Sequence, residues 1–209
     1  MKNQQVVESP GADSEAAPGA ARPLRADARR NRERLVAAAR EVFTEQGAGA
    51  SMEAVARQAG VGVGTLYRHF PQRIDLVEAV YSNDVEELAE AARVATATLE
   101  PWPAVVAFFE AFARYARTKQ TLLSELQQAF EKNPDLRSHC RGLIDGAFDL
   151  VIDRARQAGV IRDDVSGADV TQLVSPVCTN PAIDPAQSER LMAMILDGLR
   201  YPAEVPAHP

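Results

Sequence analysis

The sequence predicts an all-α protein with a small three-helix domain at the N-terminus and a bundle of about six further helices behind it. Apolar residues recur at spacings of three and four through most of the chain, which is the period of an amphipathic helix. Glycine and proline separate the periodic segments, where helices should end and begin. No segment alternates Val, Ile or Thr with polar residues as a half-buried strand would.

The first predicted helix covers residues 27–46. Its apolar residues, among them Leu35 and Phe43, fall on one stripe that can pack against a neighbouring helix. We expect Phe43 to form the centre of a small core with Leu66 and Phe70 from the next segment.

Residues 51–70 read as two short helices joined by a tight turn. Ser51 is a good N-cap because its hydroxyl can accept a bond from a free N–H of the first turn. Gly60 should end the first helix in the left-handed conformation, and the turn through Gly62 has the length used in a helix-turn-helix. The second helix exposes polar and aromatic tips, and a helix of this kind suits the DNA major groove.

The segment AGVGVGTLYRHFPQR, residues 59–73, resembles the DNA-binding domain of the TetR family of bacterial transcriptional regulators. The likeness covers residues 29–81 and consists of an alanine-rich helix, a glycine turn, a threonine, an aromatic residue and His-Phe. It implies an N-terminal helix-turn-helix DNA-binding domain followed by a helical-bundle domain for ligand binding and dimerisation. We place the domains at residues 22–71 and 72–202, with tails at 1–21 and 203–209.

The fourth helix should begin at Pro71 and run to about Ala97, which makes it long enough to link the two domains rigidly. A ligand that tilts its first turn would move the second helix of the helix-turn-helix. The fifth helix should begin near Pro101, and the sixth should span residues 121–132. The seventh should begin after the cap at Asn133. The last two should begin at the capping box of residues 166–169 and at Asp184, and Pro176 should kink or shorten the first of them.

Charge is divided unevenly along the chain. The formal net charge is −6, but residues 22–73 hold ten Lys and Arg against five Asp and Glu. Residues 74–209 hold twelve against twenty-one. A basic first domain on an acidic second one favours nucleic-acid contact by one end only.

The family resemblance and the chemistry of the side chains together indicate a set of DNA contacts. Hydroxyl, guanidinium and backbone N–H groups can bind phosphate oxygens, while guanidinium groups and methyl contacts can read base edges. The basic segment before the first helix can add phosphate or minor-groove contacts. The predicted DNA-binding residues are Arg29, Arg30, Ser51, Gly64, Thr65, Tyr67, Arg68, His69 and Arg73.

Aromatic residues are concentrated in the fifth and sixth predicted helices. A core stripe and a cavity lining are equal alternatives for them, and in the resembled family this region encloses an effector pocket. Aromatic linings favour flat, aromatic or lipophilic ligands. The predicted pocket residues are Trp102, Phe108, Phe109, Phe112, Tyr115, Leu126, Phe130, Leu143 and Ala147.

The resemblance also implies a homodimer built by the last two helices. A two-fold dimer matches a palindromic operator, whose half-sites must match the spacing of the two recognition helices. The predicted interface residues are Leu173, Val174, Val177, Met192, Ile195, Leu196 and Leu199.

Other kinds of site are poorly supported. His139 and Cys140 diverge on a helix and lack an evident third ligand, so a structural cysteine is favoured over a metal site. The glycines of residues 60–64 lack the preceding strand of a nucleotide loop. No catalytic constellation, cofactor motif, apolar membrane span or signal peptide is evident, which predicts a cytoplasmic protein without enzymatic activity.

The sequence therefore predicts a DNA-binding transcriptional regulator, a repressor that binds a palindromic operator as a homodimer and releases it when a small-molecule effector binds. One alternative is a regulator or activator of the same type without an effector. A second, of another class, is an all-helical enzyme or carrier that contains a segment shaped like a helix-turn-helix.

Overall fold

The structure, a computed structural model, describes residues 21–200. Within this range the chain is helical and contains no strand. The elements are α1 (Ala21–Gln46), η1 (Gly47–Gly49), α2 (Met52–Ala59), α3 (Val63–His69), α4 (Arg73–Thr98), α5 (Pro101–Thr121), α6 (Leu123–Lys132), α7 (Pro134–Gln157), α8 (Gly167–Thr179) and α9 (Pro185–Arg200). None of these helices is both long and apolar enough to cross a membrane. The all-α prediction is confirmed for the described range. Residues 1–20 and 201–209 lie outside it, and with them the predicted tails at 1–21 and 203–209 except for Ala21.

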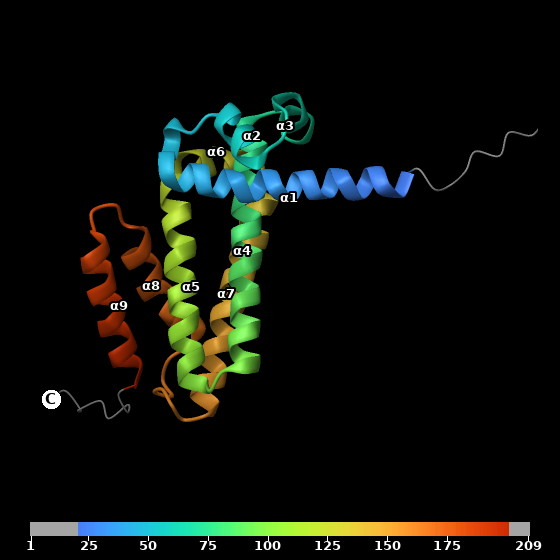
Figure 1. Ribbon diagram of the computed structural model, residues 1–209. Helices are drawn as coiled ribbons and strands as arrows, with labels where there is room; N and C mark the ends of the chain where they lie inside the picture. Colours follow the sequence, from blue (N-terminus) through green and yellow to red (C-terminus); the bar gives the residue numbers. More distant parts are fainter. Residues whose placement is uncertain (1–20, 201–209) are drawn as a thin grey trace, which may run out of the picture.

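Three long helices, α4, α5 and α7, stand side by side and contact one another (Figure 1). At one end of this group α1 lies across it, with α2 and α3 beside α1, and the N-terminal half of α1 extends away from the rest of the molecule. On the other side of α5 lie α8 and α9. The helix-turn-helix therefore lies at the N-terminal end of the long helix α4, and the bundle packs along the length of α4.

The helix starts follow side-chain caps that the sequence contains. Ser166 and Asp169 form the predicted capping box of α8, with N–H to side-chain distances of 3.2 and 2.9 Å. Asn133 accepts a bond from the N–H of Leu136 at 3.2 Å and opens α7. The predicted start of α4 at Pro71 is wrong, because Gln72 is the N-cap and forms a capping box with Asp75.

The start of α1 is also earlier than predicted, at Ala21 rather than Asp27. Pro23 falls in its first turn, where a missing N–H removes no intrahelical bond. Pro176 lies inside α8, which ends at Thr179, and the N–H of Asn180 donates to the Pro176 carbonyl at 3.1 Å.

Within residues 21–200 the buried residues form one continuous core, and two clusters within it position the helices. Phe43, Leu66 and Phe70 are at most 2% exposed and fill the space between α1 and the helix-turn-helix, as predicted. In the bundle Phe148 of α7 meets the Phe108 and Phe112 rings edge to face, with centroid distances of 4.9 and 5.0 Å. The first cluster fixes where α3 stands relative to α1, and the second joins α5 to α7.

Candidate functional site

The turn between α2 and α3 is held by backbone geometry. Gly60 has φ +64°, and its N–H donates to the Arg57 carbonyl at 3.1 Å. The next N–H, of Val61, donates to the Ala56 carbonyl at 3.0 Å. These two bonds form a Schellman motif, which needs a left-handed residue at the position of Gly60. At the other end of α2 the Ser51 hydroxyl accepts from the Ala54 N–H at 3.1 Å, as predicted for an N-cap.

One face of α3 is buried and the opposite face is open to solvent. Leu66 is fully buried in the core, whereas Tyr67 is 42% exposed. Arg68 is exposed and lies along the helix, donating to the Gly64 carbonyl at 3.2 Å and to the Thr65 hydroxyl at 3.3 Å. Val63, which was not predicted as a contact, is 40% exposed and stands one turn before Tyr67. The open face therefore combines an apolar side chain, a phenol and a guanidinium.

The other predicted DNA-binding residues of the first domain lie on α3 and α1. Gly64 is exposed, and Thr65 and His69 are half-buried on α3. Arg29 and Arg30 lie on the extending part of α1, where their guanidinium groups pair with near neighbours on the same helix, Glu33 and Asp27.

Arg73, at the start of α4, contacts parts of the protein that are distant in the sequence. Its guanidinium lies 4.7 Å from the centroid of the Phe43 ring and donates to the Ala50 carbonyl. It also donates to Glu125 of α6 at 3.2 Å. Arg73 thus ties the first domain to α6.

A second charged link joins α1 to α4. Arg40 of α1 pairs with Asp84 at 2.5 Å and with Glu87 at 2.7 Å, both on α4. Asp84 is 7% exposed. Burial raises the pKa of Asp84 to about 6, although the positive charge of Arg40 opposes this shift.

The raised pKa of Asp84 predicts a pH dependence of stability. Between the ordinary pKa of 3.8 and about 6, the folded chain keeps a proton that the unfolded chain has lost, so stability falls as pH rises through this window. Over this pH window the free energy of unfolding of the native chain should fall by on the order of 3 kcal/mol. We expect Asp84→Asn to abolish this fall. Urea unfolding of both chains at pH 4, 5, 6 and 7 measures it. Gln172→Ala, an exposed change that removes no ionisable group, is the control. Parallel curves for the native chain and Asp84→Asn would contradict the expectation.

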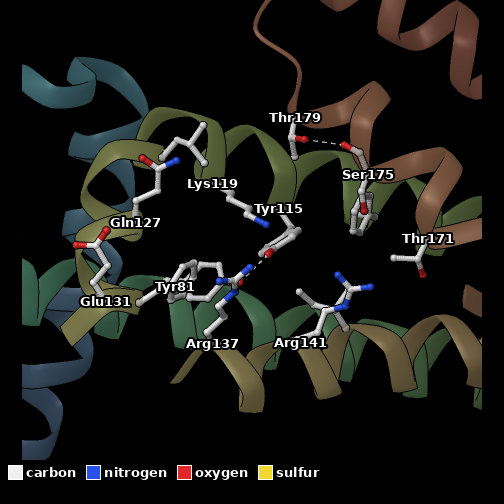
Figure 2. A pocket seen from close by; sticks show the side chains of 14 residues that line it. Tyr81, Tyr115, Lys119, Gln127, Glu131, Arg137, Arg141, Thr171, Ser175 and Thr179 are labelled. Atoms are coloured by element: carbon white, nitrogen blue, oxygen red, sulfur yellow. Dashed lines mark hydrogen bonds between the residues drawn. The ribbon is translucent and has the colours of Figure 1, made fainter. Parts of the chain in front are cut away.

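A partly open cavity of about 640 Å³ lies in the bundle, between residues of α4, α5, α6, α7 and α8 (Figure 2). Its apolar walls include the predicted pocket residues Phe112, Tyr115 and Phe130. The other residues lining it are Tyr81, Lys119, Leu123, Gln127, Glu131, Arg137, Arg141, Ile144, Thr171, Ser175 and Thr179.

The remaining predicted pocket residues do not line this cavity. Most are buried in the core or packed at its edge: Phe108, Leu126, Leu143 and Ala147. Trp102 lies at the start of α5, and the centroid of its ring is 4.7 Å from the guanidinium carbon of Arg200. Phe109 is 1% exposed and borders a separate apolar groove of about 510 Å³ between α5 and the α8–α9 region.

The sequence reasoning missed the polar side of the cavity. Arg137 and Arg141 are four residues apart on α7, and Thr171, Ser175 and Thr179 follow the same spacing on α8. Side chains four apart share a helix face, so the signal was present in the spacing. Only the packing of α7 and α8 shows that both faces meet the same cavity.

The predicted dimer residues on α8 and α9 divide by burial. Val174, Met192 and Leu199 are buried within the chain itself. Val177, Ile195 and Leu196 are half-buried. Leu173 is 57% exposed, and Met194, which was not predicted, is 68% exposed.

Comparisons with known proteins agree with this geometry. The family described as "Bacterial regulatory proteins, tetR family" matches residues 35–80, and "Transcriptional regulator SbtR-like, C-terminal domain" matches residues 100–201. An HTH-type transcriptional regulator of Staphylococcus aureus (strain USA300) is 41% identical over 64 residues. These make up 30% of this chain and 35% of that relative, so the likeness covers about a third of its length.

Two solved structures match over nearly their whole length. The TetR transcriptional regulator SCO0520 from Streptomyces coelicolor is 38% identical with a TM-score of 0.72, covering 81% of this chain and 98% of that one. A TetR transcription regulatory protein from Mycobacterium vanbaalenii is 33% identical with a TM-score of 0.70, covering 86% and 100%. Both are described as regulators of transcription, and neither as an enzyme.

Proposed function

The chain belongs to the TetR family of transcriptional regulators, and from this premise we propose that it is a repressor whose homodimer binds a palindromic operator and releases it when an effector fills the bundle cavity. As a member of this family it is a regulator and not an enzyme. The observation that carries the proposal is the open face of α3, held outward by a buried Leu66 on the other side of the same short helix.

Charge supports docking by this end of the molecule. The segment of residues 22–73 is basic, and the rest of the chain from residue 74 is acidic. Phosphates attract the first and repel the second, so α3 and α1 should approach DNA while the bundle stays away from it. Val63 and Tyr67 can contact thymine methyl groups, and Arg68 can bind a phosphate or a guanine edge.

The exposed apolar residues Leu173 and Met194 support the homodimer. Large apolar side chains with more than half of their surface exposed lie on α8 and α9, the two helices proposed as the interface. Two recognition helices related by two-fold symmetry would meet half-sites of a palindrome about 34–36 Å apart.

Helix α6 supports a route from cavity to DNA. Leu123, Gln127 and Phe130 of α6 line the cavity. The same helix holds the first turn of α4 through two ion pairs, Arg73–Glu125 at 3.2 Å and Lys132–Asp75 at 3.3 Å. A ligand that shifts α6 would thus pull on the helix that follows α3, and by linkage would weaken DNA binding as much as DNA weakens ligand binding.

This route predicts the effect of removing both ion pairs. The double variant Glu125→Gln, Lys132→Gln should weaken operator binding by about threefold to tenfold, because α6 no longer holds the first turn of α4. Quantitative mobility shift measures this affinity. Gln128→Ala, an exposed change on the same helix outside the cavity lining, is the control. Equal affinity for all three chains would remove α6 from the coupling route.

The proposed function is tested by mobility shift with fragments of the DNA flanking its gene, at two salt concentrations. A shift that survives competitor DNA and weakens steeply with salt is expected, since phosphate contacts release counterions. If no fragment shifts, selection from random DNA follows, and failure to enrich a palindrome would overturn the proposal.

A further inference from the structure

Three cationic side chains share the bundle cavity. Lys119 extends from α5, and Arg137 and Arg141 extend from α7 toward the side chains of α5 and α8 (Figure 2). Among the lining residues, Glu131 is the only acid. The surrounding chain is acidic, with twelve Lys and Arg against twenty-one Asp and Glu in residues 74–209. The cavity is therefore a positive site within a negative domain.

These cations lack sufficient partners inside the protein. Within residues 21–200, the side chains of Lys119 and Arg137 have no hydrogen-bond or ion-pair partner, although the Lys119 ammonium lies 6.0 Å from the centroid of the Tyr115 ring. Arg141 pairs with Asp145 through Nε at 2.8 and 2.9 Å, which leaves its terminal nitrogens for another acceptor. Burial and the two nearby arginines lower the pKa of Lys119. Lys119 is half-buried, whereas Arg137 and Arg141 are exposed. Mutual repulsion among these three neighbouring cations favours the entry of an anion.

A buried pair of phenols supplies a further donor. The hydroxyls of Tyr81 and Tyr115 lie 3.3 Å apart, and both residues line the cavity. Burial raises the pKa of each phenol, so both keep their protons. The bond between the hydroxyls uses one of the two O–H groups, so the other O–H can donate to an acceptor in the cavity.

The rest of the wall combines the polar side chains of α6 and α8 with an apolar part. Phe112, Phe130 and Ile144 line the cavity, and its volume of about 640 Å³ is in the usual range for sites of small molecules. We propose that the cavity binds a small organic anion with a flat apolar body, its acidic group held by Lys119, Arg137, Arg141 and the tyrosine pair. This inference rests on the proposed effector-responsive function and names the chemical class of its effector.

A matched pair of probes tests the charge requirement. The sulfonate 8-anilinonaphthalene-1-sulfonate and the neutral N-phenyl-1-naphthylamine differ only by the acidic group, and both fluoresce when bound at an apolar site. The full chain should bind one sulfonate at least about tenfold more tightly than the neutral probe, because charge-assisted bonds are the strong ones. Equal affinity for the two probes, or no binding of the sulfonate, would overturn the inference.

Substitutions locate the bound sulfonate. Lys119→Gln combined with Arg137→Gln should reduce the preference for the anion to less than about threefold, because two unpaired cations are lost. Arg93→Gln removes an arginine of similar charge from the exposed surface of α4 and should keep the full preference. Circular dichroism and the melting temperature verify that each variant is folded. A preference that survives in the double variant would place the anion elsewhere and refute the site.

Two acidic groups share this chemistry, and displacement distinguishes them. Phenyl phosphate and 3-phenylpropanoate are each titrated against the bound sulfonate, and the tighter competitor identifies phosphate or carboxylate as the preferred group. Operator binding is measured separately by mobility shift. If the chain binds an operator but shows no preference for the anionic probe, the regulatory proposal stands and the anion site is refuted. If it shows the preference but binds no operator, the anion site stands and the regulatory proposal is refuted.

Discussion

Gly167→Ala is expected to lower the free energy of unfolding by about 1–3 kcal/mol, as overpacking at a close contact does. Gly167 is the first residue of α8 and is buried against α7. A Cβ atom there would lie 2.7 Å from the backbone nitrogen and 2.9 Å from the Cα of Asp149. Backbone atoms inside a helix cannot turn away as a flexible side chain can, so the two helices must separate. Urea unfolding at pH 7 measures the loss.

Gly142→Ala is the matched control for this substitution. Gly142 is exposed on α7, and a Cβ atom added there meets nothing within 4 Å. Alanine should therefore stabilise α7 by about 0.5–1 kcal/mol, its advantage over glycine in a helix interior. Destabilisation by Gly167→Ala alone is the expected contrast. Equal stability of both variants and the native chain would mean that α7 and α8 do not approach so closely.

The same contact has a consequence for the cavity. Thr171 and Ser175 line it from α8, one and two turns after Gly167. Separation of α8 from α7 at Gly167 would move these hydroxyls away from Arg141 across the cavity. We therefore expect Gly167→Ala to weaken binding of the anionic probe as well as to lower stability.

The helix-turn-helix could be predicted from the sequence because local rules specify it. The Ser51 hydroxyl caps α2 by accepting from the N–H three residues ahead. At the other end, the Gly60 N–H donates to the carbonyl three residues back, and the N–H of the next residue donates to the carbonyl five residues back. Phe43, Leu66 and Phe70 are buried because their spacing places them on inward faces. Each signal operates within one or two turns of helix.

The cavity could be predicted only in part because it depends on contacts between distant helices. Phe108 and Phe112 are on one stripe of α5, yet Phe108 is covered by Phe148 while Phe112 also reaches the cavity. An aromatic stripe alone cannot tell these environments apart. Arg73 shows the same limit, since Glu125, its partner on α6, is 52 residues away along the chain.

The second large effect is expected at the open face of α3. Tyr67→Ala should weaken operator binding by about tenfold or more without changing the melting temperature by more than a few degrees, because Leu66 and not Tyr67 anchors α3 to the core. Mobility shift and thermal unfolding measure the two quantities. Arg93→Ala, near the far end of α4, should leave both unchanged. An unchanged operator affinity in Tyr67→Ala would remove the phenol from the contact surface.

The way in which Arg68→Ala changes DNA affinity distinguishes a phosphate contact of Arg68 from a base contact. If its guanidinium binds a phosphate, Arg68→Ala weakens binding to all sequences alike and reduces the salt dependence by about one counterion. If it binds a guanine edge, the variant loses about 1–3 kcal/mol and accepts other bases at one operator position. Its bonds to Gly64 and Thr65 hold the side chain along α3, the helix proposed to enter the major groove. We therefore expect the second result, and a uniform loss across operator variants would contradict it.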